Sequence, residues 1–135
     1  MPVKEARKQS IAAALINRNP ALTVFQFRFA ELAASYGISI DEAKIRFRHL
    51  ELNGPDVGNG IQITLLDDGA RLTVPYWHKD DKARVVFSEI WVYLTVIRTT
   101  AGYEIHDPQL DRIIDLDSDL KDVVNCYSGV IKAIW

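Results

Sequence analysis

Three carboxylates at alternate positions, Asp115, Asp117 and Asp119, have the spacing in this chain that most resembles a metal site. They match the first three ligand positions of a calcium loop. The match fails further along, because Leu120 stands where the loop needs glycine and Cys126 where it needs a bidentate glutamate. We therefore interpret these carboxylates as acidic residues at the first turn of a helix, where they interact favourably with the positive end of the helix dipole.

The histidines, His49, His78 and His106, fall in different expected elements and lack the close spacing of a metal-binding pair. We therefore predict no metal site and no cofactor. His78 follows Tyr76 and Trp77 at the end of an expected strand, where loops often carry binding residues. These three residues are candidates for binding, although closing an edge of the core is the commoner role of such aromatic side chains.

Catalytic patterns are not evident in the sequence. It has no glycine-rich phosphate loop, no nucleophile elbow and no convincing pair of catalytic carboxylates. Cys126 has no basic neighbour that would activate its thiol, so we interpret it as a small core residue. We expect no catalytic residues and a protein that is not an enzyme; in an enzyme, His78 or His106 would be the candidate acid–base residue.

Length and composition favour a single globular domain over residues 1–135. Apolar residues make up 48% of the 135 residues and charged residues 25%, as in ordinary folded proteins. The longest uncharged apolar-rich stretch, residues 90–97, is far shorter than the roughly 20 residues that cross a bilayer. No export signal is visible and the single cysteine excludes an internal disulfide, so we expect a cytoplasmic protein without a membrane partner.

Charge is distributed unevenly along the chain. Residues 1–54 carry eight basic and five acidic side chains, whereas residues 55–135 carry eight basic and thirteen acidic ones. Seven of these thirteen acidic residues lie in residues 104–122, and on one face of a fold they would form an acidic patch. The candidate residues of this patch are Asp111, Asp115, Asp117, Asp119 and Asp122.

The first part of the chain predicts helices. Residues 3–16 form a first helix, and a capping box that begins at Thr23 starts a second one that ends at Gly37. Ser39 begins a third helix by the same capping logic. Residues 49–52 fit either the end of that helix or a strand.

The rest of the chain predicts an α+β fold. Residues 60–66 and 70–76 alternate in polarity around Asp-Asp-Gly, as in a β-hairpin. Residues 83–101 have the length and periodicity of a long helix, and residues 103–106 and 112–116 suggest short strands. A last helix is expected after Asp117 or Ser118, with an apolar stripe. We thus predict N-terminal helices, a small, mostly antiparallel sheet, a long helix and a C-terminal helix. The stripe comprises Leu120, Val124, Tyr127, Ile131 and Ile134.

One segment of about 25 residues contains Leu32, Ala33, Tyr36, Gly37, Ile38, Ser39 and Ala43. This pattern resembles the helix-turn-helix of bacterial regulators. The resemblance implies DNA binding, for which the basic residues Lys44, Arg46 and Arg48 are candidates. Asp41 and Glu42, at the start of the same helix, would repel phosphates, and an ordinary corner between two helices would give the same pattern.

A second resemblance involves a helix that ends in Gly102-Tyr103 and is followed by Asp107-Pro108-Gln109. This pattern is similar to a motif of small bacterial proteins, some of which resemble immunity proteins encoded beside secreted toxins. The resemblance implies a non-catalytic protein that covers a toxin's active site. Asp107 and Pro108 also suit a simple turn between strands.

Two functional hypotheses follow. The first is a non-catalytic binding protein of the immunity type, whose acidic patch would complement a basic toxin. The alternative is a regulator that binds nucleic acid through residues 39–50.

Overall fold

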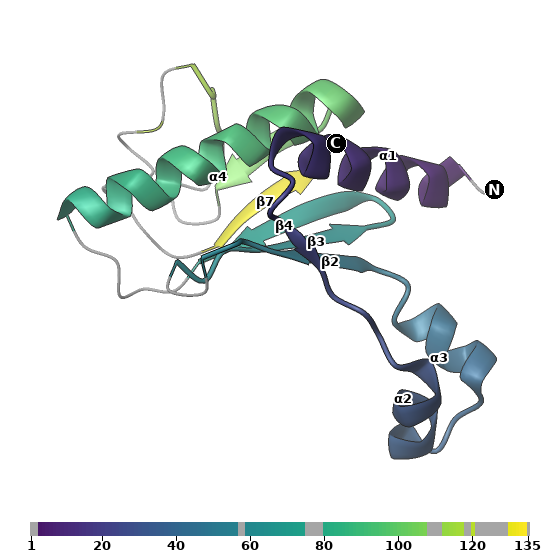
Figure 1. The fold of residues 1–135 in the computed structure, drawn as a ribbon. Coiled ribbons are helices and arrows are strands. Elements are labelled where there is room, and N and C mark those ends of the chain that lie inside the picture. Colours follow the sequence, from purple (N-terminus) through teal and green to yellow (C-terminus); the bar gives the residue numbers. More distant parts are fainter. Residues whose placement is uncertain are drawn as a thin grey trace.

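The computed structural model describes residues 3–56, 59–74, 80–107, 112–117, 120 and 130–134. Within these residues the fold is α+β: two helices, α1 (Val3–Arg18) and α4 (Asp80–Ala101), pack together on one face of an antiparallel sheet (Figure 1). No helix of the described residues covers the opposite face of the sheet in the same way. The predicted fold class is therefore confirmed.

Both long helices form where the apolar spacing predicts them. In α1, Ile11 and Leu15 are buried, and in α4 the residues at helical spacing, Ile90, Leu94 and Ile97, are almost fully buried. These faces meet each other and the sheet, so most of the core lies between the helices and the strands.

The sheet is built from short strands with simple connections. Its central hairpin was predicted: β3 pairs with β4 around a turn of two residues, because Leu66 lies opposite Gly69. Every pair of neighbouring strands in the described chain is antiparallel. The order in the sheet is β1 (Thr23–Val24), β2 (Leu50–Asn53), β3 (Gln62–Leu66), β4 (Gly69–Thr73), β7 (Val130–Ile134), β5 (Glu104–Asp107) and β6 (Arg112–Ile113).

Buried and accessible side chains alternate along the strands, so the sheet has a core face and an open face. Leu52 of β2, Ile63 of β3 and Leu72 of β4 lie opposite one another and are all buried. Their chain neighbours Glu51 and Arg71 lie on the other side, since successive side chains of a strand point to opposite faces. The open face is therefore polar and accessible.

The predicted capping box at Thr23 is wrong. Thr23 and Val24 form the edge strand β1, and helix α2 (Phe29–Tyr36) begins only at Phe29. Pairing with β2 satisfies the backbone groups of this segment, and such pairing depends on residues about thirty positions away. The same pairing decides residues 49–52 in favour of a strand, which spans Leu50–Asn53.

The expected C-terminal helix does not extend over the last residues of the chain. Val130–Ile134 is a strand that occupies an interior position of the sheet, between β4 and β5. The β-branched side chains of Val130, Ile131 and Ile134 suit a strand as well as a helical stripe, and two neighbouring strands supply the backbone partners. Residues 121–129 lie outside the described part of the chain.

Helices α2 and α3 (Ile40–Arg46) form a unit of their own. They pack against each other and stand away from the sheet, at the end of the two chain segments that continue β1 and β2 (Figure 1). We call this projection, residues 25–49, the arm. Its two short helices each have a single fully buried residue, Ala33 in α2 and Ala43 in α3. The arm therefore has almost no core of its own.

Candidate functional site

An aromatic cluster lies where the arm leaves the sheet. The ring of Phe27 is at its centre, with centroid distances of 5.1 Å to Phe25, 6.2 Å to Phe29, 5.9 Å to Phe47 and 5.0 Å to His49. The contacts with Phe25 and His49 have the edge-on geometry that aromatic pairs prefer. We call these five residues the aromatic cluster. These ring contacts, rather than a buried hydrophobic core, hold the arm to the sheet.

The surface of the arm is unusually apolar. The exposed fractions are 48% for Phe25, 59% for Tyr36, 48% for Ile40 and 62% for Ile45. Scattered apolar side chains are normal on a surface, but several large ones on one short projection indicate a binding surface. Tyr36 also contacts Phe47, with 5.7 Å between ring centroids, and so extends the aromatic cluster outward.

Two grooves flank the root of the arm. The first, of about 510 Å³, lies between the end of α3 and the β3–β4 turn; we call it the arginine groove. The second, of about 680 Å³, lies along the segment that leads into α2; we call it the aromatic groove. The arginine groove is lined by Arg46, Arg48, His49, Leu66, Asp67, Asp68, Gly69, Ala70 and Arg71. The aromatic groove is lined by Phe25, Gln26, Phe27, Arg28, Glu31 and Leu32.

A buried lysine joins the arm to the body of the fold. Lys8 of α1 is only 1% exposed, and its ammonium group lies 2.9 Å from carboxylate oxygens of both Glu5 and Asp67. It also donates a hydrogen bond of 2.9 Å to the backbone carbonyl of Arg48, at the root of the arm. The Arg48 guanidinium in turn lies 2.7 Å from Asp67. Hydrogen bonding to Lys8 holds the pKa values of the Glu5 and Asp67 carboxyls below their usual range.

A second polar network lies between the two long helices. The Tyr93 hydroxyl accepts a hydrogen bond of 3.0 Å from Asn19, just after α1, and donates one of 2.7 Å to Glu89. Burial, with help from the hydrogen bond to Glu89, raises the pKa of Tyr93 to about 12. The network satisfies a buried hydroxyl and fixes the packing of α1 on α4, so we assign it a structural role.

The predicted acidic patch is only partly within the described residues. Asp115 and Asp117 are exposed on either side of the buried Leu116, and the Asp117 amide donates a hydrogen bond of 2.9 Å to the Asp115 carboxylate. The Leu116 carbonyl accepts a hydrogen bond of 2.7 Å from the Trp91 indole, which ties this segment to α4. The other members, Asp111, Asp119 and Asp122, lie outside the described residues, as does the predicted binding loop Tyr76, Trp77 and His78.

The described residues of the Gly-Tyr and Asp-Pro-Gln motif, Gly102, Tyr103 and Asp107, belong to the fold of the sheet and α4. Gly102 has φ 71° and ends α4, as predicted. Tyr103 is buried in the core, and Asp107 lies opposite Arg112 in the β5–β6 pair. Pro108 and Gln109 lie outside the described residues.

The local features of the helix-turn-helix resemblance are present. Gly37 has φ 66°, and the Ser39 hydroxyl accepts a hydrogen bond of 3.0 Å from the Glu42 amide, so the turn and the helix cap are both as predicted. The basic side chains have protein partners, however. Arg46 lies 2.8 Å from Glu42, and Arg48 pairs with Asp67, whereas Lys44 is exposed on α3.

The aromatic cluster does not follow from the predicted helix that begins near Thr23. Phe25, Phe27 and Phe29 alternate with polar residues, which is typical of an extended segment, but Phe25 and Phe29 also fit the spacing of that helix. This alternation of aromatic and polar residues was the signal in the sequence that indicated an extended segment. His49, which was not expected to bind a metal, packs against Phe27.

Within the described residues, no group of three or more potential ligands could hold a metal ion, and no helix has the length and apolar character to cross a membrane. No family model, curated protein or solved structure matches the chain.

Proposed function

We propose that this chain is a non-catalytic binding protein and that the arm holds another protein. The observation that carries the proposal is the exposure of Phe25, Tyr36, Ile40 and Ile45 on a projection that has almost no core of its own. Aromatic and large aliphatic side chains supply most of the energy at the centre of protein interfaces. A partner that covered the arm would remove these side chains from water and complete their packing.

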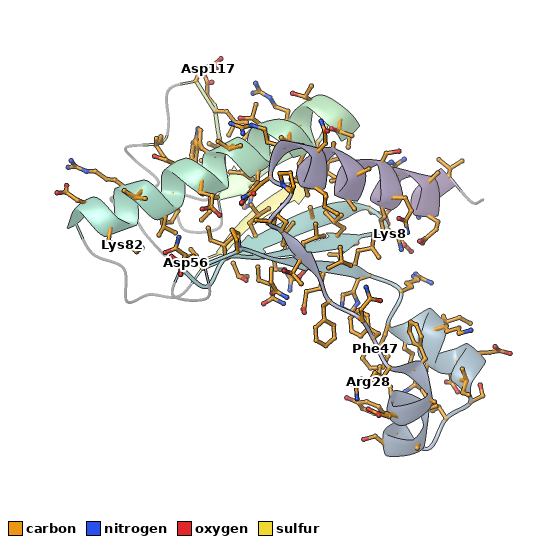
Figure 2. The ribbon with its side chains drawn as sticks, viewed as in Figure 1. Lys8, Arg28, Phe47, Asp56, Lys82 and Asp117 are labelled. Atoms are coloured by element: carbon orange, nitrogen blue, oxygen red, sulfur yellow. The ribbon has the colours of Figure 1, made fainter. Side chains whose placement is uncertain are left out.

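In its most specific form, the proposal is that the partner is a bacterial toxin and the protein is its immunity protein. Asp117 lies near one end of the molecule, whereas Arg28 and Phe47 of the arm lie near the other (Figure 2). Asp115 is hydrogen-bonded to the Asp117 amide and so belongs to the same acidic region. One compact interface would not cover both regions. We therefore favour the arm over the acidic patch as the principal contact.

A photocrosslinking experiment tests this proposal. A photoreactive amino acid is placed at Tyr36 or Ile45 on the arm, and at Val85 as a control. Val85 is 61% exposed near the start of α4, and this end of the helix, marked by Lys82, lies away from the arm (Figure 2). The arm positions should give one defined protein adduct in lysate of the source cell, and Val85 should give none. Equal labelling from all three positions, or no adduct from the arm, would contradict the proposal.

Substitutions then test whether the same surface carries the affinity. Ile45→Ser should weaken binding of the identified partner by about tenfold or more, as expected for a central apolar contact. Val85→Ser, an equivalent loss of exposed apolar surface elsewhere, should have little effect. If both variants bind like the unchanged protein, the arm is not the interface.

DNA binding through residues 39–50 is the second candidate, favoured by the Gly37 turn and the Ser39 cap. To bind DNA in this way, Arg46 and Arg48 would have to break their ion pairs with protein carboxylates and form new ones with phosphates. Mobility-shift titrations with random duplex DNA at low salt distinguish the two functions. Retention that falls steeply with added salt would support the DNA-binding alternative, and no retention at any low-salt concentration would end it.

A further inference from the structure

We propose that the arginine groove is a carboxylate-binding site, which receives an acidic side chain of the partner segment that lies on the arm. This inference rests on the proposed function and adds the chemistry of the ligand. It commits to an acidic, partly apolar peptide segment. Three observations support it: the balance of charge around the groove, the position of Arg71 and the junction with the aromatic groove.

The groove and its immediate ion-pair partners carry more positive than negative side chains. The cations are Lys4, Lys8, Arg46, Arg48 and Arg71, and the carboxylates are Glu5, Glu42, Asp67 and Asp68. Each of the four carboxylates is already in an ion pair with a cation other than Arg71. One guanidinium therefore remains for an external anion.

Arg71 is that remaining cation. It is exposed on β4 and takes part in none of the ion pairs found among the described residues. Its cross-strand neighbours in the register are Thr64 and Lys132, so neither adjacent strand places a carboxylate directly opposite it. A guanidinium presents a planar fork of donors that matches a carboxylate in a bidentate arrangement.

The ring contact between His49 and Phe27 joins the arginine groove to the aromatic groove. His49 lines the first groove, Phe27 lines the second, and their centroids are 5.0 Å apart. The backbone amide of Phe25 donates a hydrogen bond of 2.8 Å to the Glu51 carbonyl, so the aromatic segment continues alongside β2. A single peptide segment could thus place an apolar side chain against the phenylalanines and a carboxylate beside Arg71.

The same charges argue against a polyanion in this groove. Asp67 and Asp68 also line it, and a nucleic-acid backbone would bring several phosphates near these carboxylates. The surplus of one positive charge suits one carboxylate better than a row of phosphates. We therefore favour an acidic protein segment as the ligand.

Peptide titration of the ¹⁵N-labelled protein tests the inference. The probe is a short blocked peptide with adjacent glutamates, a Gly-Ser spacer and a Leu-Phe pair, and its matched control has glutamine at both glutamate positions. The acidic peptide should shift the backbone amide signals of residues 46–49 and 66–71. Arg71→Gln should weaken its binding by about tenfold, the usual effect of losing a charge-assisted hydrogen bond.

Two variants serve as controls. Arg98→Gln removes an exposed arginine from α4 and should change the peptide affinity by less than about twofold, since exposed charges distant from a site contribute little. Arg71→Lys keeps the charge and should retain more affinity than Arg71→Gln. If Arg71→Gln does not fold, the comparison of the two peptides on the unchanged protein still decides the question.

Equal binding of the acidic and glutamine peptides would overturn the inference, as would unchanged binding by Arg71→Gln. So would the same amide shifts with duplex DNA or inorganic phosphate but not with the acidic peptide. These results leave the proposed function standing if the photoreactive positions Tyr36 and Ile45 still give one defined protein adduct and Val85 gives none. Absence of that adduct from the arm would instead reject the proposed function.

Discussion

The ammonium group of Lys8 lies 2.9 Å from the Asp67 carboxylate and connects helix α1 to the turn between β3 and β4. Asp67 also pairs with Arg48, and Lys8 donates to the Arg48 carbonyl. Three segments that are distant in sequence thus meet at one buried charge. The root of the arm is held at this point, so the orientation of the arm depends on it.

Lys8→Met should destabilise the protein. Removing one member of a buried, hydrogen-bonded ion pair leaves its partners uncompensated, and we expect a loss of about 2–4 kcal/mol in the free energy of unfolding. Urea denaturation measures this. Lys4→Met is the matched control, because Lys4 is 55% exposed on its side chain and its pair with Asp68 should contribute less than about 1 kcal/mol. Equal losses for the two variants would refute a special role for Lys8.

Acid should weaken the fold through the same cluster. The folded-state pKa values of Glu5 and Asp67 are lowered from 4.5 and 3.8, so the stability that they contribute is present above these values and is lost as the pH falls through the lowered ones. The free energy of unfolding, measured by denaturant titration below about pH 5, should therefore decrease. Lys8→Met should show a shallower decrease, and an identical slope would argue against the assignment.

Tyr93→Phe should remove part of the response to alkali. The folded-state pKa of Tyr93 is raised from 10.0 to about 12, so its contribution is complete below pH 10 and declines as the pH rises toward 12. At neutral pH the variant should lose about 1 kcal/mol, because Asn19 and Glu89 lose a partner. Unfolding curves at pH 7 and above pH 10 compare the two proteins, and the same alkaline slope in both would exclude Tyr93 as a cause.

Phe27→Ala should loosen the arm without unfolding the sheet. Phe27 is the centre of the aromatic cluster, and the arm has little other packing to hold it. Hydrogen exchange should accelerate at the amides of α2 and α3 while those of β3 and β4 remain protected. Ile45→Ser, an exposed change on the same arm, should leave the exchange nearly unchanged. Uniform acceleration over the whole chain would mean that the arm is not a separate unit of stability.

The features that the sequence determined depend on near neighbours. The Gly37 turn, the Ser39 cap and the hairpin after Leu66 each need only a few adjacent residues, and they occur as predicted, although Gly69 belongs to β4 and the turn has two residues. Helix α4 was likewise evident from its length and periodicity. In these cases a local interaction decides the conformation wherever the segment lies in the fold.

Pairing between strands that are distant in the sequence decided the conformation of segments whose local sequence patterns were ambiguous. Thr23 and Val24 became a strand because β2 lies beside them, and Val130–Ile134 did so because β4 and β5 offer backbone partners on both sides. The burial of Lys8 required α1, the β3–β4 turn and the root of the arm to meet. The candidate binding surface has the same origin: the sequence contained its phenylalanines and arginines, but only the tertiary structure gathered them at one end of the sheet, because the energy of such contacts exists only after distant segments have been brought together.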